Sequence, residues 1–145
     1  MEILRTVHSY MAYVALAFLI LAVVNAFAGL AAKRVFNMHR DLRLSLFALI
    51  LSHLQLVVGL ILYFVSASGF NALSNVGIGN LNSAARLLAL EHPLINIIAI
   101  ALITVGWSRH KKFMEGDKKF KSIGIFYGIG LVLILSRIPW NLWFD

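Results

Sequence analysis

The chain has 145 residues, of which 61% are hydrophobic and 13% charged, and its formal net charge is +7 at pH 7. Soluble domains have about 45–50% apolar and about 25% charged residues, so this composition excludes a water-soluble enzyme and a disordered chain. The lack of cysteine excludes disulfides, thiolate metal sites and iron–sulfur clusters. Basic residues among long apolar runs are typical of an integral membrane protein in a lipid bilayer and do not indicate nucleic-acid binding.

Four apolar stretches are long enough for membrane-spanning helices, which need about 20 residues each. In chain order they cover residues 7–32, 44–66, 83–107 and 122–143. Short connections favour antiparallel neighbours. The whole chain, 1–145, is therefore predicted to be one all-α transmembrane domain, an antiparallel four-helix bundle with up-down-up-down order.

The basic residues predict the orientation of this bundle. Four lie in the loop 33–43 and six in the loop 108–121, whereas residues 67–85 contain none. Because basic loops stay in the cytoplasm, both termini are expected on the outer side of the cytoplasmic (inner) membrane. The outer loop, 67–82, is expected to be irregular, with one short helical turn.

Small residues predict where helices approach each other closely. They recur every seven positions in the second stretch and stand four apart in the fourth: Ser45, Ser52, Gly59, Ser66, Gly124 and Gly128.

Ionisable side chains inside a membrane are costly, and each is therefore a functional hypothesis. Away from the basic loops the candidates are Arg5, His8, His53, Arg86, Glu91, His92 and Arg137. All except His53 fall in the outward halves of the predicted helices. This clustering predicts a site near the outer face.

His8 and His92 lie on the first and third predicted helices, which are diagonal partners in a four-helix bundle. At 1.5 Å per residue they are about 7 Å and about 12 Å from the outer helix ends. Two imidazoles facing each other across a bundle can bind the iron of a haem b from both sides. The alternative is that each histidine bonds a neighbour or reaches towards the interface.

Three arginines accompany these histidines on the side where basic residues are disfavoured. Guanidinium groups match carboxylates in two-point geometry, so Arg5, Arg86 and Arg137 are candidate ligands of the haem propionates. Lipid headgroups are the alternative for the first two, and Glu91 is a candidate partner of Arg137.

His53 lies about 20 Å from the outer end of the second helix. It is a candidate quinone contact or an alternative haem ligand, although its depth differs from that of His92 by about 8 Å. It could also be satisfied within the bundle by Gln55 or Asn25. His39 and His110 lie in the basic loops and are expected to be solvated.

Several short segments resemble small bacterial cytochrome-b-like membrane proteins with four helices. They are His8-Ser-Tyr-Met-Ala-Tyr, the stretch from Ser52 to Tyr63, Glu91-His-Pro-Leu and Arg137-Ile-Pro-Trp140. The order of His8, the Gln55-to-Gly59 stretch and His92 is also similar to one four-helix half of haem A synthase. The resemblance implies that His8 and His92 are the axial pair.

The chain departs from haem A synthase in three respects. That enzyme has two such halves, a cysteine pair in an outer loop, and a carboxylate one turn before its first histidine, where this chain has Arg5. The resemblance thus implies a bundle that holds haem rather than one that hydroxylates it.

The leading hypothesis is a b-type haem protein that transfers electrons, with quinol as a candidate donor and with a membrane redox partner or larger complex. Bis-histidine ligation favours this function because it leaves no open position on the iron. The alternative is a haem-free accessory subunit of a membrane assembly, or a homo-oligomer joined through the small-residue stripes. A transporter or channel is disfavoured because no row of ionisable groups crosses the membrane.

Overall fold

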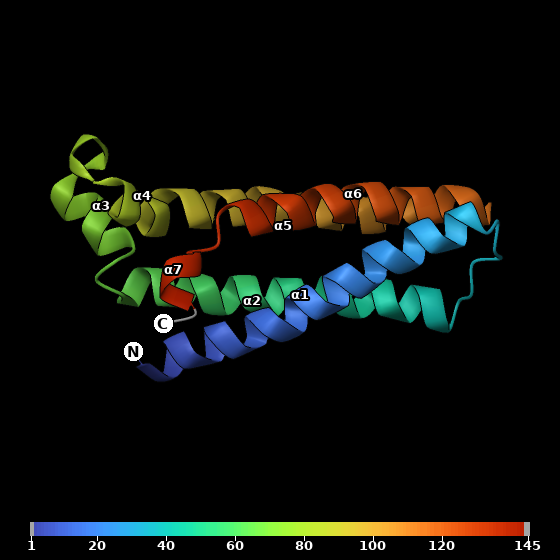
Figure 1. The fold of residues 1–145 in the computed structure, drawn as a ribbon, viewed down its shortest axis with the longest axis horizontal. Coiled ribbons are helices and arrows are strands. Elements are labelled where there is room, and N and C mark those ends of the chain that lie inside the picture. Colours follow the sequence, from blue (N-terminus) through green and yellow to red (C-terminus); the bar gives the residue numbers. More distant parts are fainter. Residues whose placement is uncertain (1, 144–145) are drawn as a thin grey trace.

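Four long helices dominate the computed structural model, which describes residues 2–143 (Figure 1). They are α1 (Glu2–Ala31), α2 (Arg40–Val65), α5 (His92–His110) and α6 (Gly116–Ser136). No strand occurs among residues 2–143, so the described chain is all-α. Both of its ends lie at the end of the long axis where α3 is found (Figure 1).

Shorter elements connect and extend these helices. They are α3 (Phe70–Val76), the 3-10 turn η1 (Ile78–Asn80), α4 (Ser83–Arg86), the π-helical turn η2 (Leu87–Glu91) and α7 (Trp140–Trp143). The loop 67–82 is therefore more helical than predicted, with α3 and η1 in place of a single turn. Asn82 caps α4 by accepting a hydrogen bond from the Ala85 amide at 2.8 Å.

Four helices are long and apolar enough to cross a membrane: Glu2–Ala31, Arg40–Val76, Ser83–His110 and Gly116–Ser136. The first three predicted spans overlap these helices closely. The fourth prediction, 122–143, is wrong at both ends, because α6 starts at Gly116 and ends at Ser136. Pro139 explains the early end: proline disfavours helical geometry at the preceding residue and lacks an amide hydrogen. Arg137 is thus the exposed C-cap of α6 rather than a residue inside a helix.

Each long helix packs mainly against two neighbours. The extensive contacts are α1 with α2 and α6, and α5 with α2 and α6, so α1 and α5 are diagonal to each other. The hydrophobic core between the long helices includes Leu19 of α1, Ile103 of α5, and Phe120, Ile123 and Tyr127 of α6, all at most 1% exposed.

Small residues permit the closest helix contacts, partly where predicted. Ser45, Ser52 and Ser66 are buried, as the seven-residue stripe predicted. In α6 the tightest position is Gly130, where an added Cβ atom would lie 2.7 Å from Ile103 and 3.0 Å from the Ala99 carbonyl. The predicted position Gly128 has only ordinary contacts, the nearest at 3.8 Å. The other predicted position, Gly124, is buried, and an added Cβ atom there would lie 3.1 Å from Phe27 of α1. The four-residue spacing thus identified one close approach of α6 and missed the closer one at Gly130.

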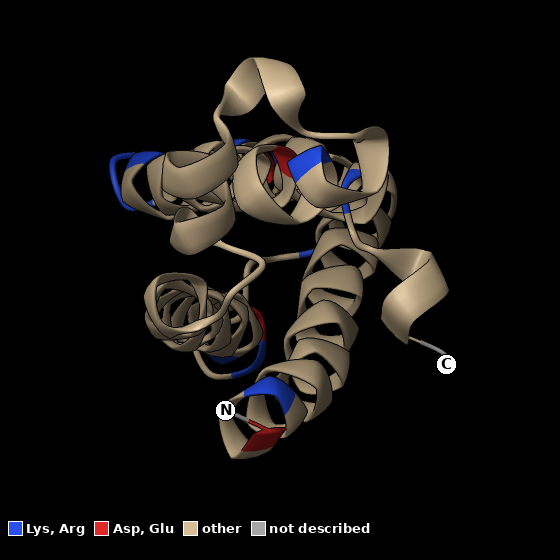
Figure 2. Cartoon of the chain, turned by 90° about the vertical axis from the view of Figure 1, so that its left-hand side faces the viewer, with Lys and Arg blue, Asp and Glu red and all other residues tan. Residues whose placement is uncertain are grey.

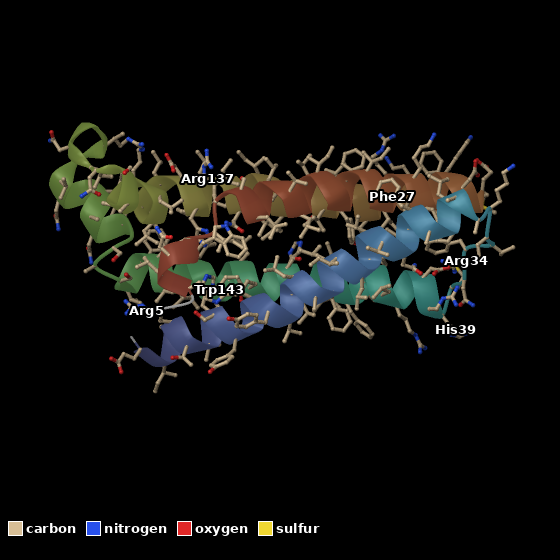
Figure 3. The ribbon with its side chains drawn as sticks, in the orientation of Figure 1. Arg5, Phe27, Arg34, His39, Arg137 and Trp143 are labelled. Atoms are coloured by element: carbon tan, nitrogen blue, oxygen red, sulfur yellow. The ribbon has the colours of Figure 1, made fainter. Side chains whose placement is uncertain are left out.

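A buried carboxylate ties together the opposite end of the bundle, where Arg34 and His39 lie (Figure 3). Asp41 is 0% exposed and accepts hydrogen bonds from the Asn25 side chain at 2.8 Å and from the Asn37 amide at 2.7 Å. Arg34 donates to both carboxylate oxygens, at 3.2 and 3.3 Å. This network, Asn25–Arg34–Asn37–Asp41, joins α1, the first loop and α2.

The loop that contains α3 has no charged residue. Viewed along the long axis, α3 and its flanking turns are free of Lys, Arg, Asp and Glu (Figure 2). The basic residues of the two loops lie at the other end of the molecule. The helix ends are therefore strongly unequal in charge, as the sequence predicted.

Candidate functional site

A cavity of about 510 Å³ opens inside the bundle at the end where α3 and the described chain ends lie. Residues of α1, α2, α5, α6 and α7 contribute to its wall. The short helix α7 returns across this end, and its Trp143 stacks on Tyr13 of α1 with ring centroids 4.6 Å apart (Figure 3).

His8 and His92 face each other across this cavity. Their ring centroids are 6.2 Å apart and their planes are nearly perpendicular, at 86°. Both residues line the cavity wall. The structure thus brings together two histidines that are 84 positions apart in the sequence and lie on diagonal helices.

The orientation of His92 is fixed through its Nδ1 atom. Nδ1 lies 2.8 Å from the carbonyl oxygen of Arg137, which can only accept, and 3.2 Å from the Asn96 amide nitrogen, which can only donate. The contact to the carbonyl is the shorter one, and Asn96 has a better acceptor in the His92 carbonyl at 2.6 Å, so we assign the hydrogen to Nδ1. Nε2 is then the nitrogen with a free lone pair. A histidine that donates one ring N–H to a backbone carbonyl and keeps the other nitrogen free has the arrangement found in metal-ligating histidines.

A π-helical turn places His92 on the cavity side. The His92 amide donates to the Leu87 carbonyl, five residues earlier, rather than to the residue four earlier. Pro93 follows and has no amide hydrogen, so it cannot bond the Ala89 carbonyl as an ordinary helix would. The Tyr63 hydroxyl of α2 donates to that carbonyl at 2.8 Å. Such turns are frequent at functional sites, and this one is stabilised by a neighbouring helix.

His8 is held by α2. Gly59 lies against the ring, and an added Cβ atom there would be 3.1 Å from His8 Cε1. The Gln55 side chain donates to the His8 carbonyl at 2.6 Å. Two buried atoms of this pair have no hydrogen-bond partner among the described residues: Nδ1 of His8 and Oε1 of Gln55. One is a potential donor and the other an acceptor, so they are chemically complementary.

The three arginines do not share one environment. Arg5 lines the cavity. Arg86 and Arg137 are absent from its described wall and flank Glu91 instead, with Nε–Oε distances of 3.0 and 3.8 Å. The predicted pairing of Arg137 with Glu91 is confirmed. Arg137 contributes to the site through its backbone carbonyl, which accepts from His92.

His53 lies outside the cavity wall that the structure describes. Its Nε2 atom lies 2.9 Å from the Thr104 hydroxyl on α5. Gln55 and Asn25 were the expected hydrogen-bond partners of His53, and this prediction was wrong. The Gln55 side chain bonds the His8 carbonyl, and the Asn25 side chain bonds Asp41.

The two loop histidines differ. His39 is exposed, as expected for a solvated residue. His110 is 0% exposed, so that prediction was wrong. Its ring lies 5.8 Å from Phe36 and 4.6 Å from Trp107, and Nδ1 bonds the Trp107 carbonyl at 2.6 Å. The first loop folds back over the end of α5 and covers it.

Three residues that hold the histidines were not singled out for that role from the sequence: Gly59, Tyr63 and Asn96, whose side chain donates to the His92 carbonyl at 2.6 Å. Two sequence signals bear on them: the small-residue stripe that contains Gly59, and the proline directly after His92, which predicts an unpaired carbonyl four residues earlier.

No protein-family model, curated protein or solved structure matches the chain. Among residues 2–143, no group of three or more His, Asp or Glu side chains is placed to hold a bare metal ion. The geometry around His8 and His92 is therefore the basis on which a function can be argued.

Proposed function

We propose that this chain is a multi-pass membrane protein that binds one haem b between His8 and His92 and transfers electrons. The observation that carries the proposal is the pair of facing imidazole rings, 6.2 Å apart on diagonal helices. Two imidazoles bound in trans to one metal ion, at about 2 Å each, have their ring centres about 6 Å apart. The pair therefore has the spacing that bis-histidine ligation requires.

The surrounding residues also fit a haem. The cavity volume of about 510 Å³ lies within the range of about 300–1,000 Å³ that is usual for cofactor sites. The bond from His92 Nδ1 to the Arg137 carbonyl directs Nε2 to a ligand. When His8 also binds through Nε2, its Nδ1–H is a donor that Gln55 Oε1 can accept, and this would satisfy both unpartnered atoms.

The chain's residues have distinct roles in this proposal. His8 and His92 would hold the haem iron, and Gly59 leaves room for the His8 ring. Arg5 is the arginine that lines the cavity and is assigned to a propionate, whereas Arg86 and Arg137 are engaged by Glu91. Haem held by two histidines would supply one-electron transfer, because no position on its iron would be left for oxygen.

Basic loops predict the cytoplasmic side, so the proposed site lies near the outer face of the cytoplasmic membrane, as do both termini. One haem near one face exchanges electrons with one compartment. A membrane redox partner or a larger complex is therefore part of the proposal, with quinol as the candidate donor. The resemblance to cytochrome-b-like proteins and to half of haem A synthase supports the same assignment.

The test is an absorption spectrum of the detergent-purified protein, produced with haem supplied, before and after dithionite. We expect a sharp Soret band and split visible bands on reduction, with one haem per chain. A flat visible spectrum would contradict the proposal and leave an accessory subunit of a membrane assembly as the better function.

Gly59 offers a separate check of how His8 is held. Gly59→Val puts branched carbon atoms where a single Cβ already lies 3.1 Å from the ring, so His8 must move. We expect the haem content of the purified protein to fall about tenfold or more, as when groups that orient a metal ligand are lost. Gly79→Val is the control, because a Cβ atom there meets nothing within 4 Å. Equal haem content in both variants would contradict the proposed contact.

A further inference from the structure

Two polar side chains meet on the outer surface of the bundle between α2 and α5. The Thr104 hydroxyl donates to the carbonyl of Ile100, one turn earlier, at 2.7 Å. Its single hydrogen is used in this bond, so Thr104 Oγ1 must accept from His53 Nε2 at 2.9 Å. These two hydrogen bonds, from Thr104 to Ile100 and from His53 to Thr104, therefore require a hydrogen on Nε2 of His53.

In the neutral ring this leaves Nδ1 of His53 as a lone-pair acceptor. Among the described residues no donor is bonded to it, and the His53 side chain is exposed. His53 is near the middle of α2, in a segment long and apolar enough to cross a membrane. Water is absent from the hydrocarbon region, so a polar atom there is expected to find its partner within the membrane.

The surface around this acceptor is apolar. Exposed neighbours on α2 are Ile50, Leu54 and Val57, at 43%, 49% and 54% exposure. A molecule that satisfies Nδ1 must therefore combine a hydroxyl donor with an apolar body that lies along lipid-facing helices.

We propose that the His53–Thr104 pair binds the hydroxyl headgroup of a membrane hydroquinone. The inference rests on the proposed electron-transfer function, for which it names the donor. His53 is six residues from Gly59, which contacts His8, and this separation is about 9 Å along the helix. A headgroup at Nδ1 is therefore close to the cavity that holds the proposed haem.

The direction of the hydrogen bonds gives the site a preference. A hydroquinone has O–H groups that can donate to Nδ1, whereas the oxidised quinone has only acceptor oxygens. A site that presents an acceptor discriminates against a ligand that lacks the donor. Reduced ligand is expected to bind more tightly than oxidised ligand of the same ring and tail.

The test is calorimetric binding of a hydroquinone with a short alkyl tail to the purified protein in lipid nanodiscs, under reducing conditions. His53→Leu removes the acceptor, and we expect binding to weaken about five- to tenfold. Thr104→Val removes the group that fixes the ring, and weaker binding is expected there too. His39→Leu is the matched control, because this histidine is exposed in the basic loop.

Unchanged affinity in His53→Leu would overturn the inference, and so would equal affinity for the quinone and the hydroquinone. A change in oligomeric state of His53→Leu with unchanged hydroquinone binding would also overturn it and would indicate a helix–helix contact between copies. The binding assay does not depend on haem, so it is repeated in His8→Ala. We expect His8→Ala to lose haem and to keep its affinity for the hydroquinone. The haem proposal and the hydroquinone proposal can therefore fail independently of each other.

Discussion

Replacing either proposed axial ligand is expected to abolish the low-spin haem spectrum. In His8→Ala or His92→Ala one side of the iron loses its nitrogen, so the six-coordinate Soret and split visible bands disappear from the reduced protein. The cavity remains, because its wall comes from five helices. Added imidazole is therefore expected to enter and restore six-coordination. The measurement is the dithionite-reduced spectrum of each variant with and without imidazole.

His53→Ala is the matched control for this experiment, since His53 is a histidine of the same bundle that lies outside the described cavity wall. It should retain the wild-type spectrum. Loss of the bands in His53→Ala with retention in His8→Ala would replace His8 by His53 as the ligand. Rescue by imidazole separates a missing ligand from a misfolded bundle, which imidazole would not repair.

The largest effect on stability is expected at Asp41. Asp41→Ala leaves the Arg34 guanidinium and the Asn37 amide without their buried acceptor. Arg34 is 30% exposed and keeps its bond to Asn25, so the cost is that of the hydrogen bonds left unsatisfied, about 1–3 kcal/mol. We expect the free energy of unfolding to fall by that amount, measured from helical circular dichroism as sodium dodecyl sulfate is titrated into mild detergent.

The control for Asp41 is Asp117→Ala. Asp117 is exposed in the first turn of α6 and makes no ion pair within the described residues. Its unfolding curve should overlay that of the wild type. Equal curves for Asp41→Ala and Asp117→Ala would show that the Asn25–Arg34–Asn37–Asp41 network does not stabilise the bundle.

The helices could be predicted from the sequence because apolar length alone marks a membrane span. Residues 7–32, 44–66 and 83–107 each overlap a long helix closely. The fourth span was placed too late because mean apolarity continues past Ser136, whereas Pro139 stops the helix. A local backbone constraint overrode the composition there.

The candidate site was predictable in part. Depth counting on diagonal helices suggested that His8 and His92 could face each other, and the structure places their rings 6.2 Å apart. Arg5, Arg86 and Arg137 were all assigned to haem propionates because the sequence predicts them on the same side of the membrane. Which carboxylate each guanidinium reaches depends on side-chain geometry, so the pairing of Arg86 with Glu91 could not be separated from a propionate contact. The burial of His110 depends on how the first loop folds over α5, which helical periodicity does not specify.

The π-helical turn at Leu87–Glu91 has a further consequence for the third membrane-spanning helix. One residue more than an α-helix needs is accommodated there, so the two flanking segments are offset by about 100° around the common axis. This offset fixes the angle around the axis between Arg86 on α4 and His92 on α5. Tyr63 holds this offset from α2. Arg86 and His92 are thus held at an angle around the helix that an uninterrupted α-helix would not give them.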